Sequence, residues 1–167
     1  AAAGHRVVVP ARRRENAKHL ILLPTVEVVE ASIHDARALA SLCAGASAVV
    51  NLVGILNESG DATFERVHVD VTRHAVTACH AAGVPRLLQM SALGAAPDGP
   101  SRYLRSKAAA EALVAASGLA WTIFRPSVIF GRGDTFLNLF AQLSRALPIV
   151  VLAAPNARFQ PIHAEDV

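Results

Sequence analysis

Tyr103 and Lys107 are the two residues whose types and spacing could do chemistry together. They lie four residues apart in an Ala-rich segment typical of a helix, so their side chains should share one face. A Tyr phenol normally titrates near pH 10, and a Lys ammonium one turn away favours the phenolate and lowers that pKa. We therefore expect Tyr103 to give or take a proton at a carbonyl or hydroxyl oxygen.

Ser91 could complete this site from a neighbouring strand. The apolar run at residues 86–90 predicts a buried strand that ends at Ser91, and the small, Gly- and Pro-rich residues 92–100 predict a loop. The Ser91 hydroxyl could then hydrogen-bond the oxygen on which Tyr103 acts. The alternative is that Tyr103 is an ordinary surface residue of the helix and Lys107 a solvated one.

Alternating strand and helix patterns supply the elements that must position these residues. Strands are predicted at 6–9, 26–30, 48–53, 86–90 and 121–124, and helices at 15–23, 35–44, 64–82, 103–116 and 135–146. Continuously apolar strands favour a parallel sheet covered on both faces. Right-handed crossovers then give a doubly wound, Rossmann-like α/β sheet, in which ligands bind beyond the carboxyl ends of the strands.

Polar or flexible residues follow four of these strands, at the edge where a ligand would bind. Arg12 and Arg13 follow the first strand, residues 51–54 the third, Ser91 the fourth and residues 125–127 the fifth. Their agreement in position is stronger evidence for a site than any one of them alone.

The ends of the sequence lead us to expect an internal piece of a longer protein, truncated at both ends. A dinucleotide-binding unit of this class opens with a strand, a Gly-rich turn and a helix whose N-terminus holds the pyrophosphate. The Gly-Arg-Gly of residues 131–133 precedes a predicted helix but follows the wrong strand and lacks a third Gly. We therefore expect a sheet that lacks its first, central strand together with the Gly-rich turn.

Composition and spacing argue against several other functions. Hydrophobic residues make up 53% of the chain and charged residues 17%, which suits a large core. The net charge is +3, but there is no basic stripe with interleaved aromatics, so we expect no nucleic-acid partner. No apolar run near the end approaches the roughly 20 residues of a membrane span, and no signal peptide is visible. Cys43 and Cys79 are expected to be buried free thiols in a reducing compartment.

Metal and hydrolase chemistry are also not expected. His68, His74 and His80 are six residues apart, so on a regular helix they cannot converge on one metal. His163 beside two acidic residues is better explained as part of a turn and helix cap. Ser127 has no obvious His base in a triad arrangement.

Ser91, Tyr103 and Lys107 resemble the Ser and Tyr-x-x-x-Lys of the short-chain dehydrogenase/reductase superfamily, in its atypical or extended branch. Within that branch the sequence is most similar to bacterial relatives of the dehydrogenase-like accessory subunit of respiratory complex I. The resemblance covers nearly the whole chain, and the segments that carry it are residues 48–55, 90–95, 103–107, 124–131 and 158–167. The most specific of them is Phe-Arg-Pro-Ser-Val-Ile-Phe-Gly at 124–131.

The resemblance implies a role for each matching position. Ser91, Tyr103 and Lys107 would be catalytic, and Lys107 would also bond the nicotinamide ribose. The other implied dinucleotide contacts are Ser32 and Ile33 at the adenine, Asn51, Leu52, Val53 and Gly54 on the adenosine and ribose side, Met90, and Pro126, Ser127 and Val128 beside the nicotinamide.

Arg12 and Arg13 stand where NAD-preferring members of the superfamily carry an acidic residue. Arginine there suits the 2′-phosphate of NADP, so we expect NADP(H) to be preferred over NAD(H). The alternative for these two residues is a solvated turn.

Three functions follow from the resemblance and the residues. The first is an NADP-dependent oxidoreductase acting on an unidentified carbonyl, hydroxyl or quinone-like small molecule. The second is a non-catalytic NADPH-binding accessory or assembly subunit of respiratory complex I or of quinone biosynthesis, and the third is a sensor of the NADP(H) redox state. The resemblance favours the second, whereas the intact Ser, Tyr and Lys favour the first.

We expect residues 1–134 to form a partial dinucleotide-binding domain, and residues 135–167 to begin a substrate lobe and return to the sheet. We expect the protein to be cytoplasmic or peripheral on the inner face of the membrane.

Overall fold

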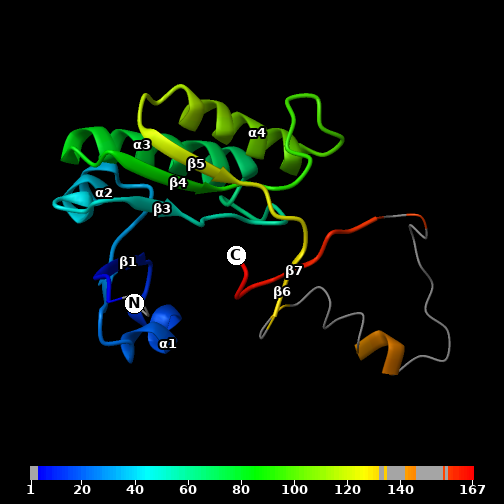
Figure 1. Cartoon of the computed structure of the whole chain (residues 1–167), viewed down its shortest axis with the longest axis horizontal. Helices are drawn as coiled ribbons and strands as arrows, with labels where there is room; N and C mark the ends of the chain where they lie inside the picture. Colours follow the sequence, from blue (N-terminus) through cyan, green and yellow to red (C-terminus); the bar gives the residue numbers. More distant parts are fainter. Residues whose placement is uncertain (1–3, 132–133, 135–141, 146–155, 157) are drawn as a thin grey trace. The chain divides into compact units, whose positions relative to one another are not determined.

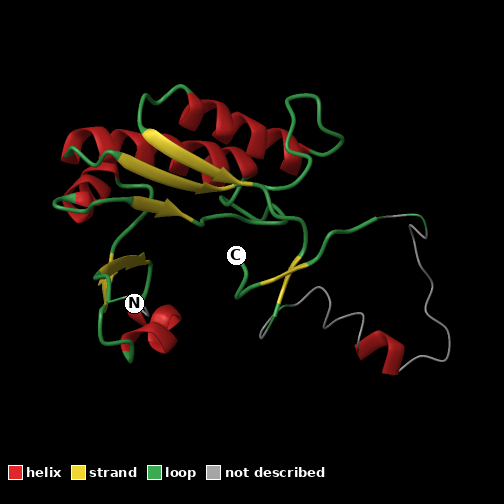
Figure 2. Cartoon of the chain, in the orientation of Figure 1, coloured by secondary structure: helices red, strands yellow, loops and turns green. Residues whose placement is uncertain are grey.

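The computed structural model describes residues 4–131, 134, 142–145, 156 and 158–167. The chain forms two compact units, Ala1–Phe124 and Arg125–Val167, and each is described by itself. Figure 1 follows the chain by colour and Figure 2 distinguishes its helices from its strands. Of the helix predicted at 135–146, residues 142–145 are helical, and the remainder lies outside the described residues.

A two-stranded parallel sheet opens the first unit. Strand β1 (Val7–Ala11) pairs with β2 (Val26–Glu30), and Val7 lies opposite Val26. Between them the predicted single helix is a short 3-10 turn, η1 (Arg14–Ala17), followed by α1 (Lys18–Ile21). The helical path stops early because Pro24 disfavours helical geometry in the residue before it.

A second parallel sheet carries the predicted chemistry. Its order is β3-β4-β5, formed by β3 (Val49–Asn51), β4 (Arg86–Met90) and β5 (Ala120–Phe124). Helices α3 (Val71–Ala82) and α4 (Arg102–Ala115) run side by side along one face of this sheet (Figure 2). Helix α2 (Ala36–Cys43) packs against α3 and begins, as predicted, at Asp35, whose carboxylate accepts hydrogen bonds from two backbone N–H groups.

The core lies between this sheet and its helices. Leu87 of β4 is fully buried there, together with Val84 and Val114. Cys43 and Cys79 lie in the same cluster, which confirms the prediction that both are buried free thiols. Residues of β4 on the covered face are therefore held firmly, and so is the Ser91 position that follows them.

Among the described residues, no strand joins the β1–β2 sheet to the β3–β4–β5 sheet. In a doubly wound sheet of strand order 3-2-1-4-5-6, the first strand separates two parallel groups of this kind. The observed pairings are those of the two sides of such a sheet, in agreement with the predicted fold class.

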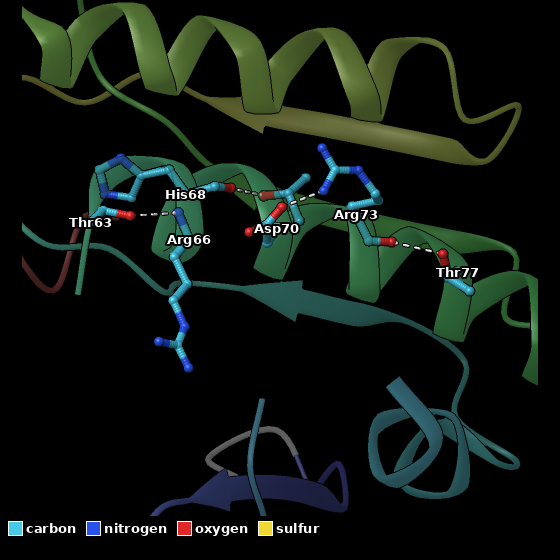
Figure 3. Close-up of polar contacts among 7 residues, drawn as sticks. Thr63, Arg66, His68, Asp70, Arg73 and Thr77 are labelled. Atoms are coloured by element: carbon cyan, nitrogen blue, oxygen red, sulfur yellow. Dashed lines mark hydrogen bonds and ion pairs between the residues drawn. The ribbon is translucent and has the colours of Figure 1, made fainter. Parts of the chain in front are cut away.

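The helix predicted at 64–82 is not a regular α-helix. Its first part is a π-helix, η2 (Glu65–Asp70), and α3 continues from Val71 to Gly83, which closes it with a φ of 66°. Figure 3 shows side chains bonding to the backbone along this segment, among them Thr77 Oγ1, which donates to the Arg73 carbonyl at 2.9 Å. Thr72 Oγ1 likewise donates to the His68 carbonyl at 2.6 Å. A π-turn is wider than an α-turn, so His68 does not share the regular α-helical spacing of the residues that follow Val71.

The second unit has a parallel pair of short strands. Strand β6 (Ile129–Phe130) pairs with β7 (Ile162–His163), and the Phe130 and His163 rings meet edge to face with centroids 5.2 Å apart. Two of the matching segments noted in the sequence, 124–131 and 158–167, thus pair with each other through β6 and β7.

Candidate active site

Lys107 is the residue on which the candidate site converges. Ser101 caps α4 by accepting a hydrogen bond from the Leu104 N–H at 3.1 Å, which sets Tyr103 in the first turn and Lys107 in the second. Lys107 is only 4% exposed, and its Nζ donates to the Met90 carbonyl at 3.3 Å. The same Nζ lies 5.9 Å from the centroid of the Tyr103 ring, so the two side chains share one face as their spacing predicts.

Ser91 follows β4 directly and is 4% exposed. Its backbone N–H donates to the Phe124 carbonyl of β5 at 2.7 Å, which fixes the position of the residue. Among the described residues, its buried Oγ has no hydrogen-bond partner. Since a buried hydroxyl without a partner is costly, this oxygen is suited to hydrogen-bond a bound molecule.

Gly54 brings the loop after β3 close to Lys107. A Cβ at this position would lie 3.1 Å from Lys107 Nζ and 3.6 Å from His68 Nε2. The lack of a side chain therefore leaves room at the lysine. A dinucleotide fits these features, because Lys107 Nζ has more hydrogen-bond donors than the one Met90 carbonyl uses.

The expected lowering of the Tyr103 pKa is wrong for this structure. Burial raises the pKa of Tyr103 above its ordinary value, because the neutral phenol needs less solvent than the phenolate. Burial also lowers the pKa of Lys107, and the nearby Glu111 carboxylate opposes that shift. The sequence spacing correctly predicted that Tyr103 and Lys107 are neighbours but predicted the wrong direction for the Tyr103 pKa shift. Spacing contains no information about how much solvent surrounds the ring.

Asn51 uses its side chain within the protein. Its amide donates to Thr72 Oγ1 at 3.2 Å and to Gln89 Oε1 at 2.9 Å, and its carbonyl oxygen accepts from the Val53 N–H at 3.1 Å. The side chain thus joins β3, α3 and β4 and shapes the loop over residues 51–54. Gln89, which is 1% exposed, was not singled out in the sequence because a lone Gln in a strand carries no motif.

His68 is the residue at this site that sequence reasoning missed. It is 2% exposed, its Nε2 accepts from the Ile55 N–H at 3.1 Å, and its Nδ1 bonds Ser106 Oγ at 2.8 Å. Burial, and next the Lys107 charge, lower the pKa of His68 to about 4. The available signal was its position four residues after Phe64, on which its ring stacks with the ring centroids 5.4 Å apart.

The remaining predicted dinucleotide residues lie apart from this cluster in sequence. Arg12 and Arg13 are exposed just after β1, and Ser32, followed by Ile33, accepts a hydrogen bond from the His34 N–H through its Oγ. Leu52 is 65% exposed in the loop after β3.

Pro126, Ser127 and Val128 belong to the second unit, whose placement against Tyr103 is not described. Within that unit, Ser127 Oγ accepts from the Gln160 N–H at 3.3 Å and the Val128 carbonyl accepts from the Ile162 N–H at 3.0 Å. These bonds hold the Pro-Ser-Val segment against the segment around β7.

The described ranges contain neither a metal-binding cluster nor a membrane-spanning helix. They contain no group of three or more His, Cys, Asp or Glu side chains placed to hold a metal ion. Within the same ranges, every helix is too short or too polar to cross a lipid bilayer.

Parallel strands with helical crossovers, with Ser91 directly after β4 and with Tyr103 and Lys107 on the helix that follows it, define a Rossmann-like nucleotide-binding protein. The chain belongs to the NAD(P)H-binding family, whose model matches residues 1–137. It is homologous to a subunit of respiratory complex I and has the fold of extended dehydrogenases and epimerases.

The chain is 34% identical, over 98% of its length, to the mitochondrial NADH dehydrogenase [ubiquinone] 1 alpha subcomplex subunit 9 of Arabidopsis thaliana. It is 37% identical, over 84% of its length, to the ceramide reductase of Caulobacter vibrioides. It spans 42% and 44% of these two proteins, less than half of each.

Solved structures show the same fold at low sequence identity. The UDP-glucuronic acid 4-epimerase of Bacillus cereus, in complex with UDP-glucuronic acid and NAD, matches with a TM-score of 0.80 and 16% identity. The match covers 98% of this chain and 63% of that one. The NADPH-dependent quinone oxidoreductase of Escherichia coli, in complex with NADPH, matches with a TM-score of 0.64 and 22% identity over 84% of this chain and 46% of that one.

Proposed function

We propose that the protein is an NADP-dependent oxidoreductase that reduces or oxidises an oxygen-bearing carbon of a carbonyl, hydroxyl or quinone-like substrate. The observation that carries this proposal is the buried Ser91 Oγ, which has no hydrogen-bond partner among the described residues. A protein that only bound the dinucleotide for stability would gain nothing from leaving this hydroxyl unpaired.

The cofactor, when bound, supplies or accepts the hydride. Ser91 Oγ donates a hydrogen bond to the substrate oxygen and fixes its position. Tyr103 then transfers a proton to or from that oxygen. A tyrosine is protonated at neutral pH, and burial, which raises the pKa of Tyr103, keeps it so; the phenol can therefore act as the acid when a carbonyl is reduced. Lys107 is held against the end of β4 by the Met90 carbonyl, and its remaining donors serve the ribose of the cofactor.

NADP(H) is proposed as the preferred cofactor. Arg12 and Arg13 are exposed just beyond β1, where a 2′-phosphate would add two negative charges beside them. The remaining proposed contacts are Ser32 and Ile33 at the adenine, residues 51–54 and Met90 along the nucleotide, and residues 126–128 at the nicotinamide. We also propose residues 1–134 as part of the dinucleotide-binding domain and residues 135–167 as the start of a substrate lobe.

A non-catalytic role is the second candidate. It rests on the 34% identity to a complex I subunit over 98% of this chain. In that role NADPH would stabilise the fold of an accessory or assembly subunit, in a respiratory complex or in quinone biosynthesis, at the inner face of a membrane. A third candidate, a sensor of the NADP(H) redox state, would bind the same cofactor and report it to a partner.

The deciding experiment compares the purified full-length protein with Tyr103→Phe. NADPH binding is measured by calorimetry, and NADPH oxidation is followed against a panel of quinones and carbonyl compounds. We expect Tyr103→Phe to keep the affinity within about threefold and to lower turnover by roughly 100-fold or more. Tight binding with no turnover by the wild type, unchanged by the substitution, would replace the oxidoreductase with the non-catalytic candidate.

A further inference from the structure

His68 connects two parts of the site that no sequence motif links. Its Nε2 accepts from the Ile55 N–H, in the loop that follows β3. Its Nδ1 bonds Ser106 Oγ, in α4 between Tyr103 and Lys107. One side chain thus contacts both the loop proposed to bind the dinucleotide and the helix proposed to carry the proton donor.

The bonding partners fix the form of the His68 ring. The Ile55 N–H can only donate, so Nε2 must present its lone pair. Ser106 Oγ donates its own hydrogen to the Tyr103 carbonyl at 2.7 Å, so it accepts from Nδ1–H. The ring is therefore neutral with its proton on Nδ1, and the lowered pKa agrees with this assignment.

The ring is also wedged between aromatic neighbours. It stacks on Phe64 with the ring centroids 5.4 Å apart. It meets Tyr103 edge to face, with the centroids 5.5 Å apart and an interplanar angle of 80°. The Phe64 and Tyr103 rings also meet edge to face, with their centroids 5.9 Å apart, so each of the three rings contacts the other two. Any displacement of His68 would move the Tyr103 ring as well as the loop.

A backbone irregularity coincides with this residue. His68 lies in the π-helix η2 (Figure 3), and its carbonyl accepts from Thr72 Oγ1. Thr72 in turn accepts from the Asn51 amide at the end of β3. A π-turn is rarer than an α-turn and recurs at functional sites, where it re-aims a side chain.

We propose that His68 is a positioning residue that couples the dinucleotide loop at Gly54 and Ile55 to the Tyr103–Lys107 face of α4. Its two ring nitrogens hold the two segments at a fixed separation, so the cofactor ribose and the proton donor stay aligned. The catalytic purpose of this alignment rests on the proposed function, whereas the coupling of the two segments depends only on the contacts of His68.

Two variants of the full-length protein separate the two bonds. His68→Asn retains a donor near Nδ1 and loses the acceptor for Ile55, whereas Ser106→Ala removes the partner of Nδ1. His80→Asn and Ser41→Ala are matched controls, since both wild-type side chains bond only nearby carbonyls away from this cluster. The readouts are the NADPH dissociation constant and the titration midpoint of Tyr103 by ultraviolet absorbance, with Tyr103→Phe as the blank.

We expect His68→Asn to weaken NADPH binding by roughly tenfold, because the Ile55 N–H is left without its acceptor. We expect Ser106→Ala to shift the titration midpoint of Tyr103 measurably and to change NADPH affinity by less than about twofold. His68→Gln, which places an acceptor near Nε2, should restore most of the binding that His68→Asn loses. If the two variants lower only thermal stability, as the controls do, and change neither readout, the inference is wrong.

Amide hydrogen exchange of residues 52–57 distinguishes failure of this inference from failure of the proposed function. Faster exchange in His68→Asn than in the wild type supports the coupling even if the wild type proves to bind no NADPH. Equal exchange in both proteins, with NADPH binding intact in the wild type, would show that His68 does not couple the two segments. The proposed oxidoreductase function would be unaffected by that result.

Discussion

Lys107 Nζ lies 5.9 Å from the centroid of the Tyr103 ring, yet the pKa of Tyr103 is raised rather than lowered. Burial removes water from around the phenol and favours its neutral form. The free site is therefore arranged to hold a proton on Tyr103. Under the proposed function, this favours delivery of a proton by Tyr103 over its removal.

The first prediction concerns the titration of Tyr103. Its ultraviolet absorbance should change with a midpoint above the ordinary pH of about 10 for tyrosine. A pKa raised in the folded state means that the associated stability is present below pH 10 and is lost as pH rises through the folded value. Subtracting the spectra of Tyr103→Phe isolates this residue, and a midpoint below 10 would contradict the burial argument.

The second prediction concerns the unpaired hydroxyl of Ser91. Ser91→Ala removes a buried Oγ with no partner among the described residues, so stability should stay unchanged or rise by about 1 kcal/mol. Turnover should fall by roughly 100-fold, since the substrate oxygen loses its hydrogen bond. Denaturant unfolding and NADPH oxidation measure the two effects, and a loss of stability without loss of turnover would show a purely structural serine.

The third prediction separates two glycines. Gly54→Ala puts a methyl group 3.1 Å from Lys107 Nζ without backbone strain, so NADPH binding should weaken by roughly tenfold while stability changes little. Gly83→Ala is the matched control. A Cβ there would meet no atom within 4 Å, so the substitution acts only through the strain of its backbone φ of 66°. It should cost about 1 kcal/mol of stability and leave binding intact. The reverse pattern would exclude Gly54 from the site.

The fourth prediction tests cofactor choice. Arg13→Glu, or Arg12→Glu, should weaken NADPH binding by roughly tenfold and NADH binding by less than about threefold, because only NADPH carries the 2′-phosphate. Lys18→Glu makes the same charge change at another exposed position and should alter neither affinity. Equal losses for both cofactors would mean that the arginines act only through general charge.

The fifth prediction concerns acid stability. The pKa of His68 is about 4 in the folded protein against an ordinary 6.5. Because it is lowered on folding, its contribution to stability is present above pH 6.5 and is lost as pH falls through about 4. His68→Gln cannot titrate, so its unfolding free energy should depend less on pH within that window. Identical pH dependence in the two proteins would mean that His68 titrates normally.

The sequence by itself determined the order and type of most elements and the identity of the central pair. Apolar runs located all three strands of the β3–β4–β5 sheet, Asp35 and Gly83 marked helix ends correctly, and the spacing of Tyr103 and Lys107 placed them on one face. These features are local, because each depends on residues within one or two turns or on a simple period.

Only the tertiary structure decided the sign of the Tyr103 pKa and the roles of His68 and Asn51. His68 is defined by Ile55 and Ser106, which lie 13 and 38 residues away, and Asn51 by Gln89, also 38 residues away. Burial and hydrogen bonding between distant segments set these properties. No period or short motif encodes which atoms the fold brings together, or how much water it excludes from them.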